Sequence, residues 1–198
     1  GNDTIGAGAG NDYVEAGVGN DNVVGGTGND TIHLEDGNDI GFGGDGNDSI
    51  YGSWGDDNIY GGAGDDILDG GSGNDYFEAG DGNNILYGGD GGDYLKSGNG
   101  NNTLDGGDGD DYLESGDGND ILNGGSGDDY LESGDGDDIL DGGSGDDYLY
   151  SGTGNDSLNG DLGNDHYQFA AGDGIDIIED SGGTDVIEFD ASVKLEDL

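Results

Sequence analysis

The chain places an apolar side chain at every ninth residue and surrounds it with glycine and polar residues. Eighteen consecutive units of nine residues run from Ala7 to Gln168 without an insertion or deletion, after an incomplete unit at residues 1–6. Two further units, 171–179 and 180–188, follow a two-residue insertion. A fixed period of this length predicts a repeat protein in which one small structural unit is stacked many times.

Within each unit, the eighth position carries Ile, Leu, Val, Phe or Tyr, and Gly41 is the one exception. Positions 7 to 9 predict a three-residue strand whose middle side chain points into the core, because successive side chains in a strand alternate between its faces. Positions 1 to 6 are rich in Gly and Asp, and position 4 is always Gly, which predicts one recurring six-residue turn. So much glycine argues against a helix.

A second period, of eighteen residues, lies on top of the first. Position 7 of alternate units holds Tyr76, Tyr94, Tyr112, Tyr130 and Tyr148, whereas the units between them hold Ile67, Ile85, Ile121 and Ile139. Two units therefore form one coil. The predicted fold is an all-β parallel solenoid with two sheets, a Tyr ladder outside one and an Ile ladder outside the other. About ten coils at roughly 4.8 Å strand spacing give a rod about 50 Å long.

The domain organisation follows from where the repeat is regular. Residues 1–168 form the regular solenoid, residues 169–188 contain the insertion and two divergent repeats, and residues 189–198 are expected to be a capping segment, itself truncated. Solenoids need an atypical terminal unit to close the core. Because Gly1 lies within a repeat and no apolar leader precedes it, we expect the chain to be part of a larger protein. No apolar run is long enough to predict a membrane span.

Composition adds a constraint on partners. The chain has 48 acidic residues, two basic residues and a formal net charge of −46, with only 29% hydrophobic residues. Such values alone are typical of disorder, but the acids recur at fixed positions in each repeat, which points to a bound cation. The charge argues against nucleic acid and anionic lipid as partners. The chain has no Cys, so no disulfide stabilises it.

Position 6 is the candidate metal ligand, because it is Asp in all but two of the loops. Carboxylate and backbone carbonyl oxygens are hard donors of the kind that Ca²⁺ takes six to eight of, and two stacked loops together supply enough of them. The predicted ligands are Asp3, Asp12, Asp21, Asp30, Asp39, Asp48, Asp57, Asp66, Asp75, Asp93, Asp111, Asp120, Asp129, Asp138, Asp147, Asp156, Asp165, Asp176 and Asp185.

Twenty-one loops on two edges leave 19 gaps, and 19 divalent ions carry 38 positive charges, which would change the formal charge from −46 to −8. Removing this repulsion favours the compact state, so folding and Ca²⁺ binding are expected to be one event. Asn84 and Asn102 face each other eighteen residues apart, and we expect a weak or empty gap there; the alternative is that Asn substitutes silently. Zinc is disfavoured because Cys is absent and the two His are isolated, and Mg²⁺ suits carbonyl-rich loops poorly.

Two features break the pattern. At Gly41, either the strand shifts register so that an apolar neighbour turns inward or a void remains. Glu35, Ser53 and Asp161 replace the second glycine of their units, so their turns are expected to be distorted. The outward Tyr ladder is expected to stabilise its sheet through cross-strand contacts; the alternative is a stacking platform for a glycan.

The repeats G-G-x-G-[ND]-D-x-[LI]-x, for example residues 43–51 and 106–114, together with the divergent units up to Phe189, resemble the RTX (haemolysin-type calcium-binding) family. The resemblance covers essentially the whole chain. It implies a right-handed parallel β-roll with Ca²⁺ between stacked turns on both edges, in a bacterial protein exported by a type I secretion system. Such a chain is expected to be unfolded at low cytosolic calcium and folded outside the cell.

The predicted function is therefore a calcium-binding module that supports secretion, folding and stability of a larger exported protein. Its expected partners are Ca²⁺, other domains of the parent chain and the secretion machinery, and its expected location is outside the cell or on the bacterial surface. The alternative is a rigid extender or ligand-binding segment of a surface adhesin. No Cys nucleophile or Ser, His and Asp constellation predicts catalysis, so a catalytic domain, if the parent has one, is expected elsewhere.

Overall fold

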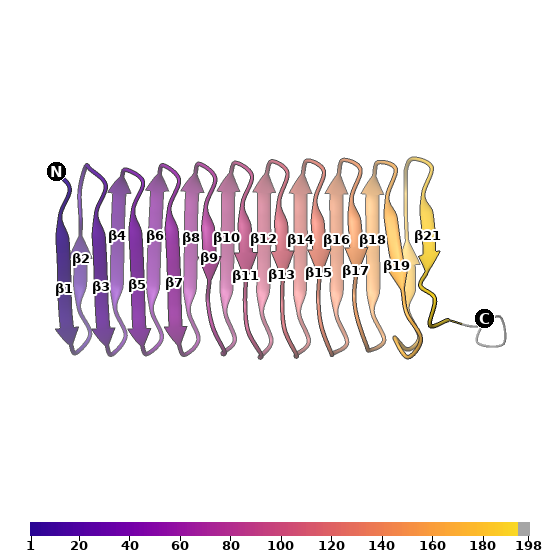
Figure 1. The fold of residues 1–198 in the computed structure, drawn as a ribbon, viewed down its shortest axis with the longest axis horizontal. Coiled ribbons are helices and arrows are strands. Elements are labelled where there is room, and N and C mark those ends of the chain that lie inside the picture. Colours follow the sequence, from indigo (N-terminus) through magenta and orange to yellow (C-terminus); the bar gives the residue numbers. More distant parts are fainter. Residues whose placement is uncertain (194–198) are drawn as a thin grey trace.

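The computed structural model describes residues 1–193, which form a two-sided parallel β-solenoid with the N-terminus at one end of the rod and the last coils at the other (Figure 1). Successive strands alternate between two sheets, so odd-numbered strands form an 11-stranded sheet and even-numbered strands a 10-stranded sheet. The predicted all-β parallel fold is confirmed.

The strands have the following bounds. The first sheet contains β1 (Thr4–Ala9), β3 (Asn22–Thr27), β5 (Ile40–Asp45), β7 (Asn58–Ala63), β9 (Tyr76–Glu78), β11 (Tyr94–Lys96), β13 (Tyr112–Glu114), β15 (Tyr130–Glu132), β17 (Tyr148–Tyr150), β19 (His166–Phe169) and β21 (Val186–Phe189). The second contains β2 (Tyr13–Glu15), β4 (Thr31–Asp36), β6 (Ser49–Trp54), β8 (Ile67–Ser72), β10 (Ile85–Asp90), β12 (Thr103–Asp108), β14 (Ile121–Ser126), β16 (Ile139–Ser144), β18 (Ser157–Leu162) and β20 (Ile177–Glu179).

The pairing register confirms that two nonapeptides make one coil. Leu113 pairs with Leu131 between β13 and β15, and Leu122 pairs with Leu140 between β14 and β16, so partners are eighteen residues apart. After the insertion the offset becomes twenty, as in the pair Tyr167 and Ile187. The insertion therefore lengthens one turn and leaves the sheets continuous.

Most strands are longer than predicted. β10 and eleven others have six residues, because the chain stays in the ladder through positions 1 to 3 of the next unit, as the pair Gly89 and Gly107 shows. The expectation of a three-residue strand and a six-residue turn was wrong for these units. Glycine suits this part of the ladder because the coils approach closely: a Cβ on Gly107 would lie 2.2 Å from the carbonyl oxygen of Gly89 in the preceding coil.

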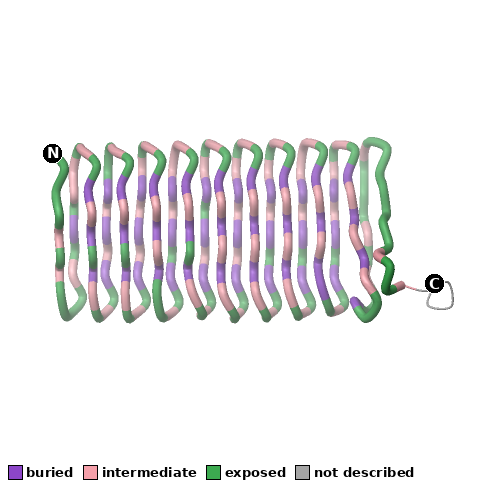
Figure 2. Tube along the Cα trace, in the orientation of Figure 1, coloured by how far each residue is buried: buried purple, intermediate pink, exposed green. Residues whose placement is uncertain are grey.

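The longer strands reveal which positions face inward. Buried residues recur at short intervals along the coils (Figure 2). They occupy positions 6, 8 and 1, as in Asp111, Leu113 and Ser115. The apolar position-8 side chains from Val14 to Tyr167 form one continuous column in the middle of the rod. Position 1 is Gly in ten of the twenty full units, and there the space is taken: a Cβ on Gly106 would lie 2.3 Å from Oδ2 of Asp111. The core is thus an apolar column flanked by columns of carboxylates.

Gly41 neither shifts its strand nor leaves a void, so both expectations for it were wrong. It keeps the common register, paired with Val23 and Ile59. Leu34, at position 1 of the same unit, is fully buried, and a Cβ on Gly41 would lie 3.2 Å from its Cδ1 atom. The large side chain has moved from position 8 to position 1, so that Leu34 fills the space that Gly41 leaves.

Leu34→Ala is therefore expected to destabilise the calcium-saturated protein by about 3 kcal/mol, because it leaves a cavity beside a residue without a side chain. Urea unfolding in excess Ca²⁺ measures the change. The double variant Leu34→Gly with Gly41→Leu restores the pattern of the other units and should be more stable than either single variant. If the two single effects simply add, the compensation is wrong.

Glu35, Ser53 and Asp161 do not interrupt the sheets, contrary to the expected distortion. Their φ angles are 78°, 87° and 63°, as a glycine would adopt. Glu35 pairs with Ser53 across β4 and β6. These residues accept the left-handed conformation at a steric cost of about 1–2 kcal/mol each, and the repeated neighbours hold them there.

Both predicted ladders lie on the outer faces of the sheets. The aromatic column of the first sheet runs through Phe42, Tyr60, Tyr76, Tyr94, Tyr112, Tyr130, Tyr148 and His166. From Tyr76 to Tyr148 successive rings are stacked with centroids 4.7–5.2 Å apart. Since the ring faces contact one another, this arrangement favours stabilisation of the sheet over a platform for a glycan.

The C-terminal end of the solenoid is open. Ile187 of β21 is 52% exposed although it occupies position 8. Much of the last coil is exposed, because no further coil among residues 1–193 covers it (Figure 2). The ring centroids of Phe189 and Phe169 lie 6.0 Å apart, and a turn at Asp190–Val193 follows. Residues 194–198, the second half of the expected capping segment at 189–198, lie outside the described residues. Residues 1–193 contain no helix that could cross a membrane.

Candidate metal sites

The position-6 side chains stack on the two edges of the rod as predicted. In each of the 19 gaps, the backbone N–H of one position-6 residue donates to the Oδ1 atom of the position-6 side chain in the next coil, over 2.6–3.2 Å. Asp111, for example, accepts from Asp93 at 2.8 Å and donates to Asp129 at 2.8 Å. Each carboxylate other than those of Asp3 and Asp12, in the first coil, is therefore held by the coil before it.

The second carboxylate oxygen has no donor. Oδ2 is buried and without a hydrogen-bond partner in Asp12, Asp21, Asp30, Asp39, Asp48, Asp57, Asp66, Asp75, Asp93, Asp111, Asp120, Asp129, Asp138, Asp147, Asp156 and Asp165. A buried anionic oxygen without a partner is costly. These atoms occupy the same position in successive loops, so the repeat produces a row of buried anionic oxygens. A bound cation would neutralise their charge.

Asn84 and Asn102 show what surrounds this atom. The Nδ2 group of Asn102 donates to the carbonyl oxygens of Gly98 at 3.0 Å and Gly100 at 2.9 Å. Asn84 likewise donates to Gly80 at 2.9 Å and Gly82 at 3.5 Å. These carbonyls belong to positions 2 and 4 of the same unit. In an aspartate unit the side chain has an oxygen in place of this amide nitrogen, so it has no donor to offer these carbonyls.

The terminal loops differ from the others because each has only one neighbouring coil. Asp3 and Asp185 are exposed and Asp176 is half-buried, whereas Asp39, Asp66 and Asp165 inside the rod are fully buried. All nineteen predicted residues thus take part in the stacking, but those at the ends are more accessible to water.

A model of the RTX calcium-binding nonapeptide repeat, four copies long, matches the chain at residues 1–32, 15–50, 33–68, 60–95, 69–104, 96–131, 132–167 and 168–191. The chain belongs to the RTX calcium-binding repeat family. The matches cover almost its entire length, and they extend past the insertion into the two divergent units. No curated protein matches the chain.

The loops of this RTX chain fit Ca²⁺ on the chemistry of their donors. Sixteen of them offer a buried carboxylate oxygen that lacks a donor, beside backbone carbonyl oxygens, and both kinds of atom are hard ligands. Two stacked loops approach the six to eight oxygens that Ca²⁺ takes. RTX repeats bind calcium in general. The residues that would hold the ions are the nineteen aspartates together with the carbonyls of positions 2 and 4.

Burial makes these carboxylates hard to ionise without a cation. It raises the pKa of Asp75, Asp111 and Asp147 to about 7, although the backbone N–H that each accepts acts in the opposite direction and neighbouring carboxylates add to the rise. The same cause raises the pKa of Asp57 and Asp66 to about 6. A proton and a cation therefore compete for the same oxygens.

We expect acid to replace calcium in part. The pKa values of these groups in the folded chain, about 6 to 7, exceed the ordinary Asp value of about 4. Protonation therefore favours the folded chain fully below pH about 4, and this stabilisation is lost as the pH rises through 6 to 7. Circular dichroism in chelator between pH 8 and 4 should show β-structure increasing as the pH falls. No change above pH 4 would contradict the assignment.

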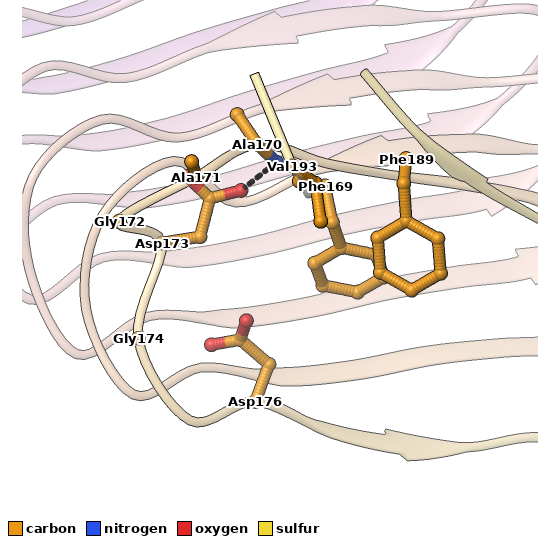
Figure 3. A pocket seen from close by; sticks show the side chains of 9 residues that line it. All are labelled: Phe169, Ala170, Ala171, Gly172, Asp173, Gly174, Asp176, Phe189 and Val193. Carbon is orange, nitrogen blue, oxygen red and sulfur yellow. Dashed lines mark hydrogen bonds between the residues drawn. The ribbon is translucent and has the colours of Figure 1, made fainter. Parts of the chain in front are cut away.

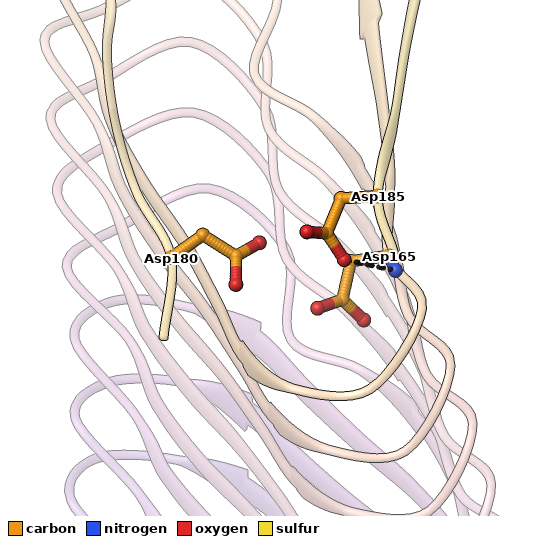
Figure 4. A group of neighbouring side chains, drawn as sticks. All are labelled: Asp165, Asp180 and Asp185. Atoms are coloured by element: carbon orange, nitrogen blue, oxygen red, sulfur yellow. Dashed lines mark hydrogen bonds between the residues drawn. The ribbon is translucent and has the colours of Figure 1, made fainter. Parts of the chain in front are cut away.

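Sequence reasoning missed three parts of the site. It placed the carboxylates at the edges without predicting that they are buried, and it did not identify position 1 as the space that accommodates them. It also missed Asp180, which lies with Asp165 and Asp185 so that one ligand atom of each is within 4.8 Å of the others (Figure 4). The signal was present, because Asp180 is the one acid at position 1 of a unit.

A hollow lies at the C-terminal end, where the insertion leaves the core open (Figure 3). The volume of this hollow is about 320 Å³, and it is lined by Phe169, Phe189 and the turn at 170–174. The Asp173 carboxylate accepts the N–H of Ala170 and so closes this turn. The hollow is the uncovered end of the apolar column, and Asp176 is the one position-6 aspartate that lines it (Figure 3).

Proposed function

We propose that this chain is a calcium-responsive RTX β-roll that is disordered without Ca²⁺ and folds when Ca²⁺ fills the gaps between its turns. The single observation that supports this is the row of sixteen buried Oδ2 atoms without a donor. An organised fold with so many unpaired anionic oxygens is unstable unless a cation neutralises them.

The charge of the chain leads to the same conclusion. With a formal charge of −46 and 29% hydrophobic residues, the free polypeptide has the composition of a disordered chain. Up to about 19 ions are expected, one for each gap, with fewer near Asn84 and Asn102, since the amide nitrogen there already satisfies the carbonyls that an ion would bind.

The calcium response suits a protein that is exported before it folds. RTX repeat proteins are typically secreted by bacteria, and a chain that stays unfolded at low cytosolic calcium is ready for passage through a secretion channel. We propose that this module folds outside the cell, where it stiffens and stabilises the rest of a larger exported protein. Its partners are then Ca²⁺, the neighbouring domains and the type I secretion machinery, and its role is structural rather than catalytic.

We propose that residues 1–168, the regular repeats, account for most of the calcium-dependent folding. Residues 169–188 continue both sheets with a changed offset, and residues 189–198 remain our proposed cap.

A calcium titration followed by far-ultraviolet circular dichroism tests the proposal, with a Mg²⁺ titration as the control. We expect a disordered chain in chelator, a cooperative rise in β-structure with Ca²⁺, and little response to the same concentrations of Mg²⁺, which demands a smaller octahedral site. A chain that is already rich in β-structure in chelator at neutral pH would refute the calcium-dependent switch.

A further inference from the structure

The last coil contains an acid that no other coil has. Position 1 is Gly, Ala, Ser or Leu in every other unit, but it is Asp180 in the final one. In the structure Asp180 lies beside the last stacked pair on this edge, Asp165 and Asp185, and one ligand atom of each lies within 4.8 Å of the others (Figure 4). An ordinary gap brings together one carboxylate from each of two loops, whereas this gap brings together three.

One member of this cluster is a buried anion without a donor. Asp165 is fully buried, and its Oδ2 atom has no hydrogen-bond partner. Its backbone N–H donates to Oδ1 of Asp185 at 3.2 Å, as in the ordinary gaps. Oδ2 of Asp165 and the hydroxyl of Tyr167 flank the same point, since a Cβ on Gly160 would lie 2.3 and 2.4 Å from them. The unpartnered oxygen is therefore directed toward the side of the gap where Asp180 lies.

Tyr167 accounts for the position of Asp180. It is the one tyrosine at position 8, it is 1% exposed, and its hydroxyl donates to Oδ2 of Asp180 at 2.7 Å. A buried phenol needs a hydrogen-bond acceptor, and Asp180 supplies it. The bond in turn holds the Asp180 carboxylate next to the gap, and it places an aromatic ring close to any ion that binds there.

From this geometry we propose that Asp165, Asp180 and Asp185 form a terminal cation site of a different kind, which binds Ca²⁺ more tightly than the other gaps and selects trivalent lanthanide ions over Ca²⁺. The proposal rests on the proposed function, because it assumes that stacked loops bind Ca²⁺. Affinity for Ca²⁺ rises with the number of charged ligands. The attraction of a third carboxylate also grows in proportion to the charge of the ion, so a trivalent ion gains more than a divalent one.

Terbium luminescence tests the proposal in the full chain. With Ca²⁺ in excess, so that the rod is folded, a titration with Tb³⁺ should show one tight equivalent with emission excited through tyrosine. Asp180→Asn keeps an acceptor for Tyr167 and should weaken this equivalent by at least about tenfold. Asp117→Asn, which removes one charge from an exposed turn, is the matched control and should leave it unchanged.

Tyr167→Phe provides a second measurement, the terbium emission excited through tyrosine, which a change in folding alone would not explain. It should strongly reduce the emission excited through tyrosine, whereas Tb³⁺ excited directly should still report one tight equivalent. Equal Tb³⁺ affinity in the Asp180→Asn and Asp117→Asn variants, or the absence of one distinct equivalent, would overturn the terminal site. If calcium still folds the wild-type chain in that case, the proposed function stands and only this inference fails.

Discussion

Replacing Asp111 with Ala is expected to cost at least about 3–5 kcal/mol, since it removes the anion from a buried ionic site. It also leaves the buried N–H of Asp93 without its acceptor, which lies 2.8 Å away in the wild type. Asp111 sits near the middle of its edge, so its loss affects ions on both sides. The midpoint of a calcium titration followed by circular dichroism should move to much higher concentration.

Asp111→Asn separates the loss of the ion from the loss of the side chain. At Asn102 the amide group donates to both nearby carbonyls and Oδ1 still accepts a backbone N–H from Asn84. Asp111→Asn should therefore fold at lower calcium than Asp111→Ala and bind fewer ions than the wild type. Asp117→Ala, at an exposed acid, is the control and should have little effect. If Asp111→Asn and Asp111→Ala need the same calcium concentration to fold, the amide group does not stabilise the loop by donating to the nearby carbonyls, and this explanation is wrong.

Gly109→Ala is expected to prevent two neighbouring coils from stacking, with a cost above about 4 kcal/mol, among the largest seen for single substitutions. Gly109 has a φ of 137°, and a Cβ there would lie 1.8 Å from the carbonyl oxygen of Gly91 in the preceding coil. Both partners are backbone, so no side-chain rotation relieves the clash. Calcium titration of the variant should show incomplete recovery of β-structure.

Gly10→Ala is the matched control. Gly10 occupies the same position of its unit with a φ of 118°, but it lies in the first coil, and a Cβ there would meet no atom within 4 Å. The substitution carries the backbone penalty without the clash, so it should cost only about 1–2 kcal/mol. Similar losses in both variants would show that backbone strain, and not the contact between coils, makes position 4 glycine.

Much of this architecture could be predicted because the repeat reports it directly. The alternation of Tyr112 and Ile121 every nine residues indicates two sheets, and it does so without any knowledge of the fold. The recurrence of Asp at position 6 likewise predicts stacked carboxylates, and the structure places Asp111 in register with Asp93 and Asp129.

What could not be predicted depends on contacts across the coil. The glycines at positions 1 and 2 look like turn residues, yet Gly106 and Gly107 extend β12 because identical positions pair between coils. The exchange of bulk between Leu34 and Gly41 joins β4 and β5, which belong to different sheets, so no period within one strand reveals it.

The most direct test of the central claim is a crystal structure grown in calcium, with ions located by their anomalous scattering. The account predicts a peak in the gaps between stacked aspartates on both edges, for example between Asp93 and Asp111, and none between Asn84 and Asn102. The same solenoid with its aspartate gaps empty at saturating calcium would contradict it.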